Sequence, residues 1–254
     1  MSTYIESGHA KNTANFDHLI ALLVTYGTNY TPSNPSLAIT NLQTVLTNAQ
    51  TALTTVKNEY NGWKNATNSR EIAFEPLKGL STRLLNTLMS VGANEQTIKD
   101  YKTLNAKVQG SKLTKADSGI VADPSEDNAN KTTLPVKKTV SVSQQSFDNL
   151  IEHYDKIIKL LASVPAYNPT ETALKVATLQ TLLANLKTVN TAAYTSYAKV
   201  SNARIARNKI LYENPDALIV LAKAVKAYIK GKFGATSAEY SQVSAIKFVK
   251  VVKK

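Results

Sequence analysis

The chain has 254 residues, and 43% of them are hydrophobic, which is an ordinary share for a globular protein. It contains no cysteine, so disulfides, thiolate zinc sites, iron–sulfur clusters and a cysteine nucleophile are excluded together. The formal net charge is +12, and residues 201–254 contribute +8 of it, with eleven Lys and Arg against three Asp and Glu. Such an asymmetry concerns the partners of a protein rather than its fold.

The sequence contains no targeting or membrane signal that we can identify. Residues 1–30 lack the basic start, apolar run and small-residue cleavage site of a secretory signal. No stretch approaches the roughly 18 uncharged apolar residues that a membrane-spanning helix needs. We therefore expect a cytoplasmic protein without a transmembrane segment.

Two helices are predicted at the start of the chain. Residues 12–27 place apolar side chains at helical spacing and end at Gly27. A long helix follows Pro35, because apolar residues then step by three and four along a heptad seam, which is typical of near-parallel packing in a bundle. The seam residues are Ile39, Leu42, Leu46, Ala49, Leu53, Val56, Tyr60 and Trp63.

Two further helices complete the first half, at about residues 69–91 and 95–109. Pro76 should kink or split the first of them, because proline lacks a backbone donor and clashes with the preceding turn. Gly92 suits a left-handed cap, and Asn94 is expected to cap the last helix.

The second half repeats this plan. Its seam runs from Val176 to Val200, with Asn190 at a position where an apolar residue is expected. A single polar residue on a seam commonly fixes the register of the helices. Thr236 and Glu239 fit a capping box for the last helix.

Motifs of the first half return in the second half in the same order. The pairs are Phe16–Ile20 and Phe147–Ile151, Tyr30–Pro32 and Tyr167–Pro169, Leu42–Leu46 and Leu179–Leu183, Asn68–Arg70 and Asn202–Arg204, and Gly92–Ala93 and Gly234–Ala235. A repeat of this length indicates an internal duplication. We predict an all-α protein of two tandem homologous four-helix bundles, 1–110 and 146–254, packed separately or as one pseudo-twofold body. Residues 111–145 are polar and predict a flexible linker.

The usual motifs of enzymes are missing. There is no Gly-rich phosphate loop, and His9, His18 and His153 do not form metal-ligand spacings. Glu71 and Glu75 share a helical face, which could serve acid–base or two-metal chemistry, but an ion pair with Arg70 or Lys78 is the simpler interpretation. We expect no enzymatic activity, no cofactor, no metal and no small-molecule substrate.

A duplicated polar pair is a candidate site. Asn68 and Arg70 match Asn202 and Arg204, each at the predicted junction of the second and third helices. The pairs either form a duplicated site for an anion or a partner, or consist of an Asn that caps the next helix and an Arg that holds the turn. Capping explains the spacing and is the interpretation we favour.

The basic end is the candidate for polyanion or partner binding. Its lysines line one helix and the tail that follows, with Tyr228, Phe233, Tyr240 and Phe248 interleaved. Lysine stripes bind phosphate backbones and aromatic rings stack on bases, although aromatics at helical spacing are more often core. The candidate residues are Lys223, Lys226, Lys230, Lys232, Lys247, Lys250, Lys253 and Lys254.

Three segments carry a resemblance to a known family. They are Glu6-Ser7-Gly8-His9-Ala10-Lys11-Asn12, Arg70-Glu71-Ile72-Ala73-Phe74-Glu75-Pro76-Leu77 and Ser201-Asn202-Ala203-Arg204-Ile205-Ala206-Arg207-Asn208. They resemble a family of uncharacterised, cytoplasmic proteins of Bacteroidota, over nearly the whole chain. The resemblance implies an all-helical protein and assigns no activity or site residue.

The sequence leaves two functions open. The first is a non-catalytic interaction or scaffold protein that binds a protein partner or self-associates through its duplicated surfaces, since two linked contacts gain avidity. The alternative is nonspecific nucleic-acid binding through residues 201–254.

Overall fold

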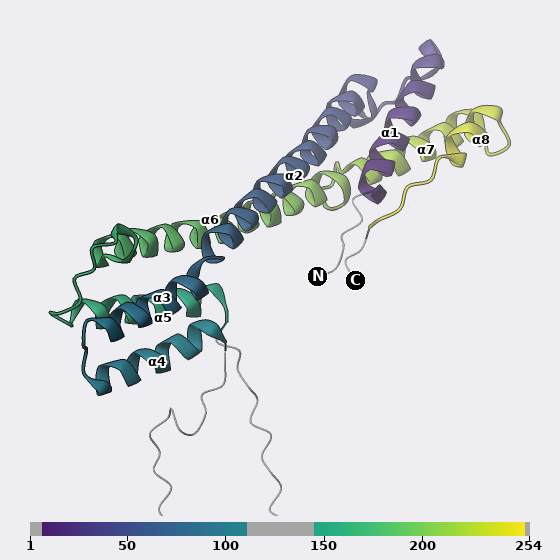
Figure 1. The fold of residues 1–254 in the computed structure, drawn as a ribbon. Helices are drawn as coiled ribbons and strands as arrows, with labels where there is room; N and C mark the ends of the chain where they lie inside the picture. Colours follow the sequence, from purple (N-terminus) through teal and green to yellow (C-terminus); the bar gives the residue numbers. More distant parts are fainter. Residues whose placement is uncertain (1–6, 111–144, 252–254) are drawn as a thin grey trace, which may run out of the picture. The chain divides into compact units, whose positions relative to one another are not determined.

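The structure is a computed structural model that describes residues 7–110 and 145–251 (Figure 1). Every regular element in these ranges is helical, which confirms the predicted all-α class. The α-helices are α1 (Ser7–Thr25), α2 (Ile39–Phe74), α3 (Leu77–Ser90), α4 (Glu95–Gln109), α5 (Phe147–Ala162), α6 (Val176–Asn208), α7 (Leu218–Phe233) and α8 (Ala238–Ala245). Single helical turns are η1 (Gly27–Asn29), η2 (Pro35–Leu37), η3 (Thr172–Leu174) and the π-type turn η4 (Lys209–Glu213).

Some predictions fall outside the described ranges. They concern the linker at 111–144 and the candidate residues Lys253 and Lys254. Within the described part of the chain, no helix is long and apolar enough to cross a membrane.

The helices group into two compact units. Unit 1 comprises residues 1–64 and 195–254, and unit 2 comprises residues 65–194. The expected division into 1–110 and 146–254 therefore differs from the grouping in the structure, and two tandem bundles are not confirmed. Each unit takes helices from both halves of the sequence, because the unit boundaries fall inside α2 and inside α6.

The long helices α2 and α6 explain this grouping. We expected the second helix of each half to end near Asn68 and Asn202, but α2 continues to Phe74 and α6 to Asn208. No proline lies between position 39 and position 75 of α2, so nothing interrupts its hydrogen bonds before Pro76. Each of these two helices is consequently long enough to contribute to both units.

Helix caps were predicted with mixed accuracy. Asn94 accepts a hydrogen bond from the Thr97 backbone N–H at 2.8 Å, as expected for the cap of α4. Gly92 has a φ of +74°, the left-handed conformation predicted for it. The capping box at Thr236 is wrong by one residue, because Ser237 accepts from the backbone N–H of Tyr240 at 3.1 Å.

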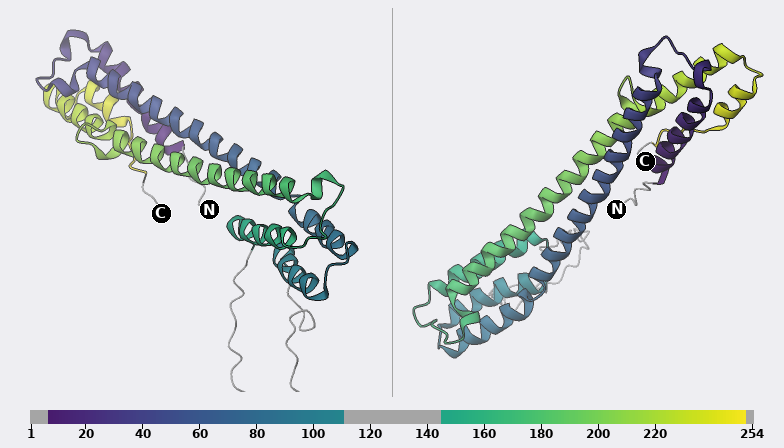
Figure 2. Two further views of the ribbon diagram at one scale, coloured as in Figure 1. Left: turned by 90° about the vertical axis from the view of Figure 1, so that its left-hand side faces the viewer. Right: turned by 90° about the horizontal axis from the view of Figure 1, so that it is seen from above.

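The core of unit 1 is formed by α1, the first part of α2, α7 and α8. In Figures 1 and 2, α7 lies beside α8, and the contacts of the structure also pair α7 with α1. Phe16, Leu19 and Leu23 on α1 are completely buried, together with Val225 and Ile229 on α7. The amphipathic periodicity of α1 and α7 therefore faces this core, as the sequence predicts.

The core of unit 2 is formed by α3, α4, α5 and the adjoining parts of α2 and α6. Helix α4 packs against both α3 and α5. Its Tyr101 is completely buried and donates a hydrogen bond from its hydroxyl to the backbone oxygen of Ser81 at 2.9 Å. Burial of the phenol among apolar side chains raises the pKa of Tyr101, so it stays protonated and remains a donor.

Candidate interaction surface

Arg70 lies at the centre of a polar network in unit 2. Its Nη1 donates to Oδ1 of Asn190 at 3.2 Å, and its guanidinium carbon lies 4.0 Å from the centre of the Phe147 ring. The network continues through Asp148, whose two carboxylate oxygens accept from Nδ2 of Asn190 at 2.8 Å and from the hydroxyl of Tyr194 at 2.6 Å. The polar seam residue Asn190 is therefore buried with two polar partners, which removes most of the cost of burying it.

The duplicated polar pair does not form one site. Asn68 and Arg70 belong to unit 2, whereas Asn202 and Arg204 belong to unit 1. Both asparagines lie inside a long helix and are exposed, so the predicted capping role is wrong for both. The helix simply continues past the point where a cap would be needed.

The lysines of the basic end do not form one free stripe. Lys226 donates to the backbone oxygen of Ile246 and lies 5.3 Å from the Phe248 ring centre. Lys230 lies 5.6 Å from the ring of Tyr240. These lysines therefore hold the segment after α7 in place, and burial lowers the pKa of Lys226.

The remaining described lysines differ in their surroundings. All four are exposed, but Lys232 donates to Oγ1 of Thr31 at 2.9 Å and lies 5.9 Å from the Tyr228 ring, and Lys247 donates to the backbone oxygen of Ser244 at 3.3 Å. The other two are Lys223 and Lys250. The four interleaved aromatic side chains pack against the unit 1 core, which is the simpler of the two interpretations. They are therefore not a free surface on which bases can stack.

An exposed aromatic cluster in unit 1 was missed from the sequence. It consists of Tyr60, Trp63 and Tyr197, with ring centres 5.6 Å apart for Tyr60 and Trp63 and 5.7 Å apart for Trp63 and Tyr197. Tyr60 is 40% exposed and Tyr197 is 56% exposed. The seam pattern had assigned these residues to a packed helix interface.

A rotation of the apolar stripe does not explain the exposure. Leu42 and Tyr60 are 18 residues apart, which is five full turns of an α-helix, so they lie on the same face of α2. Leu42 is completely buried and Val56 is only 3% exposed, so the seam is still buried one turn before the cluster. The signal that could have revealed the cluster is the concentration of large aromatic residues in the last two turns of the seam.

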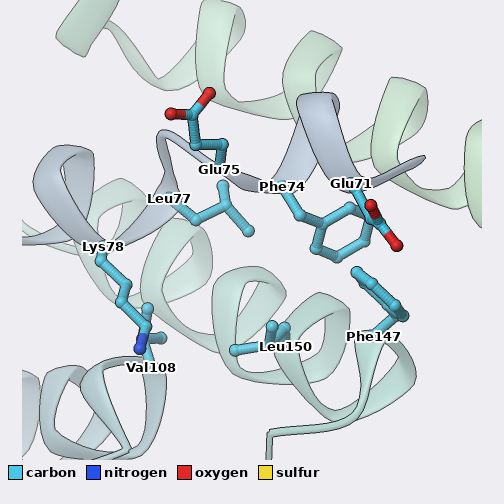
Figure 3. A pocket seen from close by; sticks show the side chains of 8 residues that line it. All are labelled: Glu71, Phe74, Glu75, Leu77, Lys78, Val108, Phe147 and Leu150. Atoms are coloured by element: carbon cyan, nitrogen blue, oxygen red, sulfur yellow. The ribbon is translucent and has the colours of Figure 1, made fainter. Parts of the chain in front are cut away.

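Unit 2 contains a shallow hollow of about 350 Å³. Figure 3 shows that the side chains of Phe74, Leu77, Phe147 and Leu150 converge on it. The other lining residues are Val108 and the three charged residues Glu71, Glu75 and Lys78. The hollow is thus an apolar surface with charged side chains beside it.

The two glutamates of this hollow are not paired in the way we expected. Arg70 is directed to Asn190 and Phe147, and no ion pair joins Glu71 or Glu75 to Arg70 or Lys78. The described residues also contain no group of three His, Asp or Glu side chains that could hold a metal ion. The expected ion pair is therefore not formed by these residues, although both glutamates are exposed, as expected for a solvated helical face.

The three histidines differ in their surroundings. His9 is buried in unit 1, where its Nδ1 lies 2.7 Å from the hydroxyl oxygen of Tyr212. His153 is buried in unit 2, and His18 is exposed in unit 1.

No known protein family matches the chain, and neither a curated protein nor a solved structure is similar to it. The resemblance to a Bacteroidota family stays a prediction that none of these comparisons tests.

Proposed function

We propose that the protein is a non-catalytic interaction protein that self-associates through the aromatic cluster of unit 1. The single observation that supports this function is the contact of Tyr60 and Tyr197 with Trp63, with Tyr60 40% and Tyr197 56% exposed. Tyr and Trp are enriched among the residues that supply most of the binding energy of protein interfaces. Exposed rings in mutual contact are also already ordered, which reduces the entropy cost of binding.

A second copy of the chain is the proposed partner. Tyr60 and Tyr197 hold matching positions in the two halves of the sequence, so the cluster offers two similar rings around one indole. A twofold contact uses the same patch on both copies, and such a patch can place Tyr rings of one copy against Trp63 of the other. Lys57 and Lys64 lie one turn on either side of Tyr60, so the two copies repel each other at low salt.

The duplication predicted from the sequence is part of this proposal. Two hydrogen bonds with the same spacing support it, one in each unit. The hydroxyl of Tyr30 donates to the backbone oxygen of Leu37 at 2.7 Å, and that of Tyr167 donates to Leu174 at 3.0 Å. We propose that each unit is a copy of one ancestral bundle, assembled from both halves of the chain, and that the protein acts in the cytoplasm.

Analytical ultracentrifugation tests the self-association. We expect association that rises with protein concentration and strengthens with salt, because salt screens the repulsion between lysines. The exposed-site variant Tyr60→Ser/Tyr197→Ser should remain a monomer. Ile72→Ser, at an exposed position of unit 2, is the matched control and should associate like the unchanged protein.

Trp63 provides a second readout, since it is the only tryptophan of the chain. Its fluorescence should change over the same concentration range as the sedimentation coefficient. A strict monomer at every concentration and salt, or equal association of the Tyr60→Ser/Tyr197→Ser variant, contradicts the proposal.

Nucleic-acid binding through residues 201–254 is a second proposal, which the exposure of Lys223, Lys247 and Lys250 supports. Since the aromatic side chains of this region are packed, binding would rest on phosphate contacts and would weaken steeply with salt. Fluorescence anisotropy with a labelled single strand tests it, with Lys223→Gln/Lys250→Gln as the variant. Absence of binding at low salt contradicts it. The two proposals thus predict opposite effects of salt.

A further inference from the structure

We infer that the hollow of unit 2 is a docking site for an extended peptide of a partner, in which lysines alternate with large apolar residues. This site lies in unit 2 and goes beyond the proposed self-association, which concerns residues of unit 1. The floor of the hollow is formed by Phe74, Leu77, Val108, Phe147 and Leu150. Its volume of about 350 Å³ falls in the range of roughly 300–1,000 Å³ that is typical of ligand pockets.

The charges beside the hollow select a basic occupant. Glu71 and Glu75 are both exposed, and neither takes part in an ion pair within the described part of the chain. The Glu71 carboxylate lies beside the Phe147 ring, whereas Glu75, one turn further along the chain, lies above Leu77 at the edge of the hollow (Figure 3). In a protein of net charge +12, two free carboxylates beside an apolar surface form a local acidic feature that attracts lysine side chains.

The position of Arg70 keeps these carboxylates available. Its guanidinium stacks on Phe147 and donates to Asn190, so Arg70, the arginine nearest in sequence, does not pair with Glu71 or Glu75. Lys78 is the one cation among the lining residues. It is exposed on a flexible side chain and lies at the opposite side of the hollow from Glu71 (Figure 3).

Unit 1 contains an example of the proposed occupant. Phe16, which matches Phe147 in the sequence, is completely buried, and the ring of Phe248 contacts it edge-on at a centroid distance of 6.5 Å. Phe248 belongs to the segment Ile246–Val251, in which Lys247 and Lys250 alternate with apolar residues. Ile246, Phe248 and Val251 pack on the unit 1 core, whereas both lysines are exposed.

This segment is also held through its backbone. The side chain of Asn12 accepts from the backbone N–H of Val249 at 3.1 Å and donates to its oxygen at 2.7 Å. A lysine–apolar segment can therefore cover a surface built around a phenylalanine at this sequence position. In unit 2 the matching Phe147 is only half-buried and lines the hollow, and the carboxylates stand beside it.

A synthetic peptide with the sequence of residues 246–251 is the probe, labelled for fluorescence anisotropy and titrated with the full-length protein. We expect saturable binding that weakens with salt. Glu71→Gln/Glu75→Gln should weaken it by about three- to tenfold, the effect of losing one or two exposed charge pairs. Lys78→Gln should strengthen binding, because it removes a like charge beside the hollow.

Matched controls separate local from overall charge effects. Glu213→Gln/Asp216→Asn removes two negative charges, as Glu71→Gln/Glu75→Gln does, and Lys175→Gln removes one positive charge, as Lys78→Gln does. These control positions are exposed and do not line the hollow, so the control variants should change binding less than the variants at the hollow. A peptide with glutamate in place of both lysines should not bind. The Tyr60→Ser/Tyr197→Ser variant should bind the peptide as the unchanged protein does. Peptide binding can therefore be tested whether or not the protein self-associates.

Three results overturn the inference. The first is equal binding by Glu71→Gln/Glu75→Gln and the unchanged protein. The second is an equal loss in Glu71→Gln/Glu75→Gln and in Glu213→Gln/Asp216→Asn, and the third is equal binding of the acidic peptide. Equal binding by the Glu71→Gln/Glu75→Gln variant and the unchanged protein is also the result expected if the peptide displaces the Ile246–Val251 segment from unit 1 instead of entering the hollow. Each of these variants alters an exposed side chain, so we expect all of them to fold.

Discussion

Arg70 on α2 donates a hydrogen bond to Asn190 on α6 at 3.2 Å, which joins the two long helices within unit 2. Asn190 in turn donates a hydrogen bond to Asp148 on α5 at 2.8 Å. The guanidinium and the carboxylate are thus linked through a neutral amide rather than by direct contact. Asn190, the one polar residue in the apolar seam of α6, therefore connects α2, α5 and α6.

A double-mutant cycle measures this connection. Arg70→Gln and Asn190→Ala should each destabilise the protein, and their coupling energy should be about 0.5–1.5 kcal/mol, the usual net value of a hydrogen bond to a partly buried group. Urea unfolding of the four proteins provides the measurement. The control cycle combines Arg83→Gln, at an exposed position, with Asn190→Ala, and these two changes should show no coupling. Equal coupling in both cycles would contradict the network.

His153 makes stability depend on pH. It is 95% buried and has no hydrogen-bond partner on either ring nitrogen within the described structure. Burial lowers its pKa, and the nearby positive charge of Lys107 lowers it further, whereas Glu152 acts in the opposite direction. Folding therefore favours the neutral ring.

The sign of the effect follows from linkage. The unfolded chain binds a proton near the ordinary histidine pKa of about 6.5, while the folded protein resists protonation until lower pH. Stability should therefore decline as the pH falls from about 7.5 through 6.5, and it should decline less in His153→Phe. Thermal unfolding across this range tests the prediction, with the exposed His18→Gln as control. Parallel curves for the unchanged protein and His153→Phe would show that the prediction is wrong.

Several elements could be predicted from the sequence because a local rule decides them. Pro76 must end a helix, since it lacks the backbone donor, and α2 ends at Phe74. Gly92 takes a conformation that other residues adopt at a cost, and Asn94 offers an acceptor to free backbone donors. The all-α class could be predicted as well, because the spacing of apolar residues by three and four is also a local pattern.

The grouping of the helices could not be predicted from periodicity. An apolar stripe shows that a helix packs, but it does not identify the helix against which it packs, and α2 and α6 each contribute to both units. The exposure of Tyr60 could not be predicted either, because Tyr60 lies on the same face of α2 as the buried Leu42 and only the packing of the other helices decides which part of that face is covered. The direction of the Arg70 side chain depends on Asn190, 120 positions away.

Lys226 should hold the segment that follows α8. Its ammonium donates to the backbone oxygen of Ile246 and lies near the Phe248 ring. Lys226→Met removes the donor but keeps the apolar stem, so the expected cost is about 1–2 kcal/mol, reduced because the buried charge is removed as well. Hydrogen exchange at Val249, whose N–H is bonded to Asn12, should become faster.

The control for this change is Lys223→Met, three residues earlier on α7, where the lysine is exposed. It should leave exchange at Val249 unchanged. Equal protection of Val249 in all three proteins would mean that the lysine does not hold the segment.

The two matching tyrosines provide a direct test of the two units. Tyr30 and Tyr167 are buried, and each donates its hydroxyl to a backbone oxygen seven residues further along the chain. Burial raises the pKa of Tyr30, and it raises that of Tyr167 to about 12, so both remain donors at neutral pH. Tyr30→Phe and Tyr167→Phe should each lower the free energy of unfolding by about 1 kcal/mol, because a buried carbonyl loses its partner.

The double variant should then lose the sum of the two single losses, because the two residues belong to different units and to separate hydrogen bonds. Chemical unfolding of the four proteins measures this additivity. Hydrogen exchange adds the location, since Tyr30→Phe should loosen amides of unit 1 and Tyr167→Phe those of unit 2. A loss confined to one tyrosine would show that the two bonds are not equivalent, and the proposed duplication would lose its support in the hydrogen bonds.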